Sequence, residues 1–301
     1  MIKSLKELVE AAKNQKTMKL SVAAAQDDEV LMAVDEAAKM GIVEPILVGD
    51  AEKIKEISEK INIDVKKYEM IDEKDITQAA RKAVELVSSG KADFLMKGIL
   101  GTADLLKAVL DKEIGLRTDR LLSHVMVYEV NTYPKLLFLT DGGMNIAPTL
   151  EEKKQIIQNA VDVCKALGIQ KPKVAALAAV EVVNPKMQAT LDAKALAEMA
   201  EKGEIKDAIV EGPLAFDLAV SKEAATHKGV KSEVAGDTDI LLVPYIEVGN
   251  GIGKCMTYMA KAKSAGIVMG AKVPVVLVSR ADTHESKLYS IALGSLIAGN
   301  K

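Results

Sequence analysis

The segment Ser279-Arg280-Ala281-Asp282 places a hydroxyl, a guanidinium and a carboxylate directly after the apolar run 275–278. Only four of the 40 basic residues are arginine, so an arginine here indicates a need for its planar, two-pronged donor geometry. A guanidinium can bind phosphate or carboxylate through two parallel hydrogen bonds, whereas lysine meets it as a point charge. The segment therefore predicts binding of a small, phosphate-bearing anion, with Arg280 as a phosphate ligand.

Asp282 has a second interpretation that concerns structure alone. A helical pattern follows it, and either Asp282 or Thr283 could be the N-cap of that helix. The two roles are compatible, because a helix N-terminus is also a site where anions bind.

The glycine-rich stretch 249–253 suggests a second anion-binding turn. It is not a P-loop, because Val248 stands where the first glycine is needed and Cys255 replaces the magnesium-binding hydroxyl. No dinucleotide-binding pattern is completed either. A glycine-rich turn that opens a helix over 253–265 could still present backbone N–H groups to an anion, with Gly249, Asn250 and Lys254 as contacts.

Two further stretches carry cations next to expected strands. Lys97 and Gly98 follow an apolar run and precede a helix that contains Thr102, so Lys97 is either a solvated lysine or a residue that faces an anion. Arg117 and Arg120 are half of the arginines and lie just before a strand. Their proximity favours an anion site for at least one of them.

Composition excludes several classes of protein. With a net charge of -3 and a pI of about 5.8, the chain lacks the basic character of a non-specific nucleic-acid binder. It contains no apolar run of membrane-spanning length and does not begin with a signal-peptide pattern. The two cysteines indicate reduced thiols in a cytoplasmic protein, and the three scattered histidines give no support for metal catalysis.

Short apolar runs alternate with helical patterns along the 301 residues, which predicts an α/β fold with mostly parallel sheets buried on both faces. The expected strands are 19–25, 45–48, 92–96, 122–128, 135–139, 174–179, 208–210, 240–243 and 275–278. The expected helices include 29–40, 76–88, 103–110, 151–167, 193–202, 253–265 and 285–298, several of them followed by glycine (41, 90, 168, 203 and 266). Nine strands are better divided between two sheets, with a break near 141–148.

Ligands of open α/β sheets bind at the carboxyl ends of strands. Polar residues and glycine follow most of the expected strands, at 26–28, 49–50, 97–98, 140–143, 211–213 and 279–280. If two domains face each other, these ends could line one cleft.

Taken in order, these segments resemble the phosphate acetyl/butyryltransferase family over essentially the whole chain. The matching pieces are residues 22–27, 46–50, 96–98, 109–118, 123–125, 137–141, 180–187, 211–217, 227–230, 249–250 and 274–282. The resemblance implies two α/β/α domains, similar to those of isocitrate and isopropylmalate dehydrogenases, with the active site in the interdomain cleft. The implied domains are 1–140 plus 280–301 and 141–279.

The resemblance also implies a reaction: acyl-CoA and phosphate give acyl phosphate and CoA, in a butyrate-forming fermentation if butyryl-CoA is the substrate. Coenzyme A is then a substrate or product and no cofactor is needed. The expected partners are acyl-CoA and inorganic phosphate, with no nucleic acid and no membrane, in a homodimer or higher homo-oligomer. We expect direct transfer in a ternary complex, without a metal or a covalent acyl-enzyme.

The chemistry assigns roles to residues 279–287, which we call the terminal segment. A thiol with a pKa of about 8.5 is mostly protonated at neutral pH, so a base must help it to attack. Asp282 and Glu285 are the candidate bases, because Ser286 stands where acetyl-transferring relatives carry an aspartate. Ser279 can donate to the oxyanion of the transition state. A second position also differs from the family: this chain has Lys107 where relatives often carry arginine.

The predicted catalytic residues are Ser279, Arg280, Asp282 and Glu285. The predicted substrate-, phosphate- and CoA-binding residues are Lys97, Gly98, Thr102, Arg117, Arg120, Ser123, Asp141, Asn145, Gly249, Asn250 and Lys254. Butyryl-CoA is the favoured substrate. The alternatives are a phosphate acetyltransferase, a non-catalytic CoA-sensing domain and, because of the shared architecture, an NAD-linked decarboxylating dehydrogenase.

Overall fold

The computed structural model describes residues 1–279 and 282–300. The chain forms two compact units. Met1–Leu5 and Leu121–Ser264 make the middle unit, and Lys6–Arg120 with Ala265–Lys301 make the flanking unit. These bounds differ from the expected domain limits at 140/141 and 279/280, so that division and the cleft expected with it stay predictions.

The flanking unit is built on a sheet with the strand order β3-β2-β1-β4-β11-β10. The first five strands are parallel, and only β10 runs antiparallel to its neighbour β11. Val22 of β1 lies between Leu47 of β2 and Met96 of β4, and all three side chains are buried. The strands are β1 (Met18–Ala23), β2 (Val43–Gly49), β3 (Glu69–Asp72), β4 (Phe94–Lys97), β10 (Lys263–Met269) and β11 (Val275–Val276).

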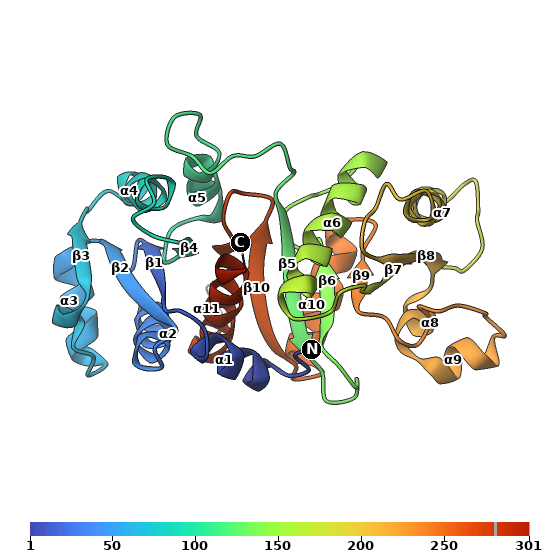
Figure 1. Cartoon of the computed structure of the whole chain (residues 1–301), viewed down its shortest axis with the longest axis horizontal. Coiled ribbons are helices and arrows are strands. Elements are labelled where there is room, and N and C mark those ends of the chain that lie inside the picture. The colour runs from blue at the N-terminus through green and yellow to red at the C-terminus, as the bar shows by residue number, and fades with distance from the viewer. Residues whose placement is uncertain (280–281, 301) are drawn as a thin grey trace. The chain divides into compact units, whose positions relative to one another are not determined.

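Helices cover both faces of this sheet. Figure 1 shows α4 and α5 on one face and α2 and α11 on the other. The helices are α1 (Leu5–Lys13), α2 (Asp28–Lys39), α3 (Ala51–Lys60), α4 (Ile76–Ser88), α5 (Thr102–Val109) and α11 (His284–Gly299), with a 3-10 turn, η1 (Val65–Lys67). Only the first residue of α11, His284, and its last, Gly299, are exposed. Residues 287–297 are all buried, which is why the helix is largely apolar on every side.

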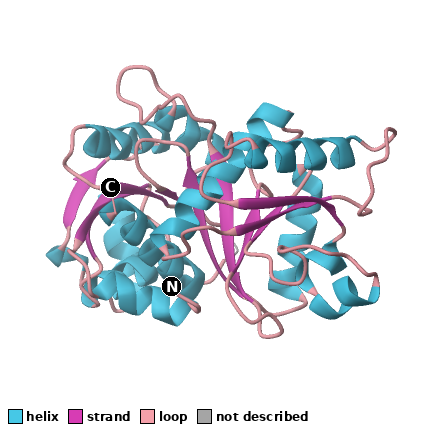
Figure 2. Ribbon diagram, turned by 45° about the vertical axis from the view of Figure 1, so that its right-hand side comes forward, coloured by secondary structure: helices cyan, strands magenta, loops and turns pink. Residues whose placement is uncertain are grey.

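The middle unit has the strand order β5-β6-β9-β7-β8, with β5 antiparallel to β6 and the other pairs parallel. Helices α6 and α7 lie on one face (Figure 1), and α8, α9 and α10 pack around an apolar core on the other. Figure 2 shows the strands between helices within each unit. The elements are β5 (Ser123–Glu129), β6 (Leu137–Thr140), α6 (Leu150–Ala166), β7 (Lys173–Leu177), α7 (Gln188–Glu201), β8 (Ile209–Leu214), α8 (Phe216–Val220), α9 (Lys222–His227), β9 (Ile240–Leu242) and α10 (Ile246–Tyr258).

The α/β prediction is confirmed, and each of the nine expected strands overlaps an observed one. Two strands were missed: β3 is a half-exposed edge strand without an apolar run, and the first three residues of β10 were included in an expected helix. The bounds of the helix expected over 253–265 were wrong, because α10 spans Ile246–Tyr258. Gly266 lies in β10 and does not follow a helix. Tertiary packing overrides the low helix propensity of the glycines in α10.

In the part of the chain that the structure describes, no helix is both long and apolar enough to cross a membrane.

Candidate functional site

The parallel strands of the flanking unit bring several predicted site residues to one edge of its sheet. β1, β4 and β11 run in the same direction, so the residues that follow them emerge at the same edge. Lys97 ends β4, and Ser279 comes three residues after β11. Lys97 and Ser279 therefore lie near the same edge of the sheet in the flanking unit.

The Lys97 turn is buried and tightly packed. Lys97 is only 5% exposed, and its ammonium donates to the carbonyls of Gly98 at 3.0 Å and Leu100 at 3.2 Å. A Cβ on Gly98 would lie 2.0 Å from the carbonyl oxygen of Ala24, so only glycine fits there. Lys97 is therefore a buried cation and not the solvated lysine that the sequence left open. Thr102 is the first residue of α5, partly exposed at the beginning of that helix.

The terminal segment forms a turn in front of α11. The Asp282 carboxylate accepts a hydrogen bond from the backbone N–H of Ser279 at 2.8 Å, and the Asp282 N–H donates to the Ser279 carbonyl at 3.1 Å. Thr283 is the N-cap of α11, since its hydroxyl accepts from the Ser286 N–H at 3.3 Å. The structure thus assigns the cap to Thr283, and Asp282 shapes the turn instead. Arg280 lies outside the described residues.

Two further side chains support this segment. The Glu285 carboxylate accepts from the Tyr289 hydroxyl at 2.7 Å, one turn along α11. The buried Lys287 ammonium donates to the Asp282 carbonyl. Lys287 was not among the predicted residues, because an isolated lysine within an apolar helical pattern gives no signal of the loop that it holds.

Arg117 and Arg120 are exposed on a loop that is fixed at other positions. The Thr118 hydroxyl donates to the Gly270 carbonyl at 2.5 Å, and the Lys272 N–H donates to the Leu116 carbonyl at 2.8 Å. Both arginines thus extend from an anchored backbone, which suits a phosphate contact.

Arg81 has a structural role, because it pairs with Asp111 at 2.7 Å. Hydrogen bonds from the Glu113 backbone, from Arg81 and from the Ile114 backbone lower the pKa of the Asp111 carboxyl to about 2. The pair lies beside the loop that carries the exposed arginines and helps to order it.

In the middle unit, the buried Asp141 carboxylate organises the loop after β6. It accepts from the backbone N–H groups of Gly143 at 2.8 Å, Met144 at 2.9 Å and His124 at 3.0 Å, and from the Asn145 amide at 2.6 Å. These four donors account for the geometry of Asp141. A direct contact between its carboxylate and a substrate stays a prediction.

Ser123 and Asn145 have internal partners as well. Ser123 is fully buried and its hydroxyl accepts from the Asn159 amide at 2.8 Å. Asn145 donates to the Leu122 carbonyl at 3.0 Å in addition to Asp141. Both residues order the loops around β5 and β6, a role that the sequence alone did not reveal.

Gly249 and Asn250 lie within the first turns of α10 and not in a turn before a helix, so the predicted cradle of bare N–H groups was wrong. A Cβ on Gly249 would lie 2.6 Å from the Cα of Gly142, which shows how closely α10 approaches the Asp141 loop. The Asn250 amide donates to the Gly142 carbonyl at 3.4 Å. The exposed Lys254 ammonium lies 5.8 Å from the centre of the Tyr258 ring.

The comparisons with known proteins agree with this layout of short motifs. The model of the phosphate acetyl/butaryl transferase family matches residues 3–81 and 72–295. The chain belongs to this family.

Among its relatives, a phosphate butyryltransferase of Clostridium acetobutylicum (strain ATCC 824) is 52% identical over 301 residues, covering 100% of both chains. A phosphate acetyltransferase of Thermotoga maritima is 48% identical over 294 residues, covering 98% of this chain and 99% of its own. The crystal structure of a branched-chain phosphotransacylase from Enterococcus faecalis V583 superposes with a TM-score of 0.81 at 37% identity, covering 94% of this chain and 99% of the other. Because the chain belongs to this transferase family, the NAD-linked decarboxylating dehydrogenase is no longer an alternative.

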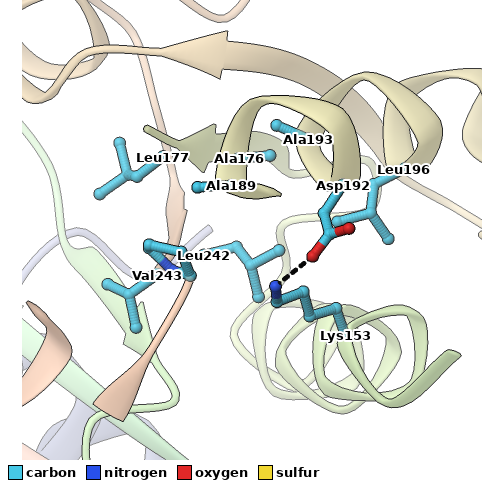
Figure 3. Close-up of a pocket in the computed structure, with 10 residues that line it drawn as sticks. Lys153, Ala176, Leu177, Ala189, Asp192, Ala193, Leu196, Leu242 and Val243 are labelled. Atoms are coloured by element: carbon cyan, nitrogen blue, oxygen red, sulfur yellow. Dashed lines mark hydrogen bonds and ion pairs between the residues drawn. The ribbon is translucent and has the colours of Figure 1, made fainter. Parts of the chain in front are cut away.

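The middle unit of this phosphate acetyl/butaryl transferase family member also contains a buried ion pair that the sequence did not indicate. Figure 3 shows the Lys153 ammonium of α6 pointing to the Asp192 carboxylate of α7, at 2.5 Å, beside apolar side chains from the ends of β7 and β9. The Tyr245 ring lies 5.3 Å from the Lys153 nitrogen, and Gln188 donates to Asp192 at 2.7 Å. The hollow here has a volume of about 10 Å³, room for one water molecule and not for an acyl chain.

Proposed function

We propose that the protein transfers a short acyl group, preferentially butyryl, between coenzyme A and phosphate. The observation that carries this proposal is the 52% identity to a phosphate butyryltransferase over the whole length of both chains. The Ser279-Arg280-Ala281-Asp282 segment, which follows β11 in the sequence, contains the residue types that the reaction needs.

Phosphate recognition is assigned to cations of the flanking unit. Arg280 is proposed as the ligand that binds phosphate, or the phosphoryl group of the acyl phosphate, through two parallel hydrogen bonds. Arg117 and Arg120, exposed on their anchored loop, are proposed to contact phosphate groups of CoA. The buried Lys97 adds positive charge beneath the turn that leads into Thr102.

Ser279 is proposed as the oxyanion donor. Attack on the acyl carbonyl places negative charge on its oxygen, and a positioned hydroxyl stabilises that charge more in the transition state than in the substrate. The hydrogen bond from the Ser279 N–H to Asp282 fixes the backbone from which this hydroxyl projects. We further propose that transfer is direct, in a ternary complex, without an acyl-enzyme, a cofactor or a metal.

The remaining predicted residues keep their proposed roles in substrate binding. These are Gly98, Ser123, Asp141, Asn145, Gly249, Asn250 and Lys254, which the structure assigns mainly to the shape of their loops and helices. The protein is further proposed to act in the cytoplasm as a homodimer or higher homo-oligomer, in a butyrate-forming fermentation.

The decisive experiment is a substrate panel. Purified protein is incubated with acetyl-, propionyl-, butyryl- or isobutyryl-CoA in phosphate buffer, and released CoA is measured with a thiol reagent. We expect phosphate-dependent release that is fastest with butyryl-CoA. Absence of thiol release from every acyl-CoA would show that the assignment is wrong and would favour a CoA-sensing role.

A preference for acetyl-CoA is the second candidate function. The 48% identity to a phosphate acetyltransferase over nearly the whole chain favours it. The ratio of kcat/KM for butyryl-CoA to that for acetyl-CoA, from the same panel, distinguishes the two.

A further inference from the structure

A histidine and a glutamate from distant parts of the sequence meet in the flanking unit. Glu29 lies in the first turn of α2, and His284 is the first residue of α11, which packs against α2. The Glu29 Oε2 atom lies 3.7 Å from the His284 Nδ1 atom. The two side chains are 38% and 47% exposed, so solvent-borne molecules can reach the imidazole.

The glutamate oxygen in this pair is shielded from solvent although its side chain is partly exposed. Glu29 Oε2 is buried and accepts no hydrogen bond from any group in residues 1–279 and 282–300. Burying a carboxylate oxygen without a hydrogen-bond donor costs free energy. The group beside this oxygen is the His284 imidazole, which can supply an N–H donor. A small movement closes 3.7 Å to a hydrogen bond, which would fix the proton on Nδ1 and leave the lone pair on Nε2.

The pair lies directly next to the segment that carries the proposed chemistry. Thr283 alone separates His284 from Asp282, whose carboxylate is engaged by the Ser279 N–H. Glu285, the other candidate base, is engaged by the Tyr289 hydroxyl. Each carboxylate thus accepts a hydrogen bond from within its own segment, whereas the imidazole has the Glu29 carboxylate beside it as an orienting group.

We infer that His284 is the general base of the acyl transfer and that Glu29 is its positioning residue. This inference rests on the proposed function. A nucleophile, a base and a group that orients the base form the arrangement that activates nucleophiles in many enzymes, and here the nucleophile is the CoA thiol. An imidazole is the side chain whose ordinary titration range matches neutral conditions.

The step balances in both directions. When acyl-CoA forms, the thiol proton moves to His284 Nε2 while the sulfur bonds to the carbonyl carbon of the acyl phosphate. The tetrahedral intermediate then collapses, and the bond from the carbonyl carbon to the phosphate oxygen breaks, with phosphate taking the electron pair. In reverse, phosphate attacks acyl-CoA and the imidazolium returns its proton to the departing sulfur.

The charged groups that could face His284 come from its own segment and from the elements that pack against α11. On α2 these are Asp28 and Glu29, and Asp28 accepts from the Glu29 N–H at 2.9 Å. On β4 it is Lys97, held by two carbonyls. Asp282, Glu285 and Lys287 belong to the terminal segment itself, and each has a hydrogen-bond partner there.

The test compares His284→Ala and Glu29→Gln with the matched controls His227→Ala and Asp28→Asn, using kcat, KM and pH profiles for the substrate that the wild type turns over fastest. Because the imidazolium must give its proton to the departing sulfur when acyl-CoA is the substrate, we expect His284→Ala to lower kcat by roughly 10²–10⁴-fold with little change in KM, to lose the alkaline limb of the pH profile, and to recover activity when imidazole is added. Glu29→Gln should lower kcat less and move that limb. The controls should match the wild type, and circular dichroism confirms folding of each variant.

Two outcomes would overturn the inference: a His284→Ala enzyme within about twofold of the wild type, or one that loses activity but keeps the wild-type pH profile and does not respond to imidazole. If His284→Ala is poorly folded, His284→Gln with the same pH profile decides. A wild type that turns over no acyl-CoA contradicts the proposed function itself, which separates that failure from this one.

Discussion

The Asp282 carboxylate accepts the backbone N–H of Ser279 at 2.8 Å, so a candidate base is also the residue that shapes the turn beneath the proposed oxyanion donor. An Asp282→Asn variant keeps an oxygen acceptor, and we expect it to retain most of the wild-type kcat. Asp282→Ala removes the acceptor and should lower kcat. Equal large losses in both variants, with loss of the pH dependence, would instead identify Asp282 as the base.

Ser279→Ala tests the hydroxyl itself. Loss of one oxyanion donor lowers kcat by roughly 10²–10³-fold in other enzymes, and we expect a similar fall with little change in the KM for phosphate. Steady-state kinetics at saturating acyl-CoA measure it. A Ser279→Ala enzyme with wild-type turnover contradicts the oxyanion role.

Arg280→Ala should raise the KM for phosphate far more than it lowers kcat, since the main loss is phosphate binding. Arg280→Lys should recover only part of the affinity, because an ammonium cannot form two parallel hydrogen bonds. Arg81→Ala is the matched control, as Arg81 pairs with Asp111 and should leave phosphate kinetics unchanged. If both alanine variants raise the phosphate KM equally, the special role of Arg280 is lost.

Two glycines of α10 should respond in opposite ways to alanine. A Cβ on Gly251 meets no atom within 4 Å, so Gly251→Ala should stabilise the helix by about 0.5–1 kcal/mol. On Gly249 the added carbon would lie 2.6 Å from the Cα of Gly142, and the variant should be destabilised because backbone must shift. Urea unfolding measures both, and a Gly249→Ala protein as stable as Gly251→Ala would contradict the close approach.

The buried Lys153–Asp192 pair predicts a non-additive result. Asp192→Leu alone leaves a buried ammonium without its carboxylate and should reduce the free energy of unfolding by roughly 3–5 kcal/mol. The double variant Lys153→Met with Asp192→Leu should recover most of this loss, since a well-packed apolar pair often replaces a buried ion pair without penalty. Additive losses in a double-mutant cycle would show that the pair contributes no coupling.

The sequence predicted the sheet strands well because buried parallel strands are continuous apolar runs, as in β4. It missed the first turns of α10, because glycine has a low helix propensity; of these glycines, Gly249 is required by the close approach to Gly142. It selected Ser123 and Asp141 as binding residues, but their internal partners, Asn159 of α6 and His124 of β5, come from elements that only the fold brings near. Glu29 and His284 gave no signal at all, since their contact depends on the packing of two distant helices.

The strand order of the flanking unit has a consequence for how a new chain folds. β11 pairs with β4, yet residues 121–264, nearly all of the middle unit, are synthesised between them. The edge of β4 must therefore wait for its partner while many residues emerge, and contacts so distant in sequence form slowly. An exposed strand edge is where newly made chains associate wrongly, so we expect chaperones to engage the chain during this interval.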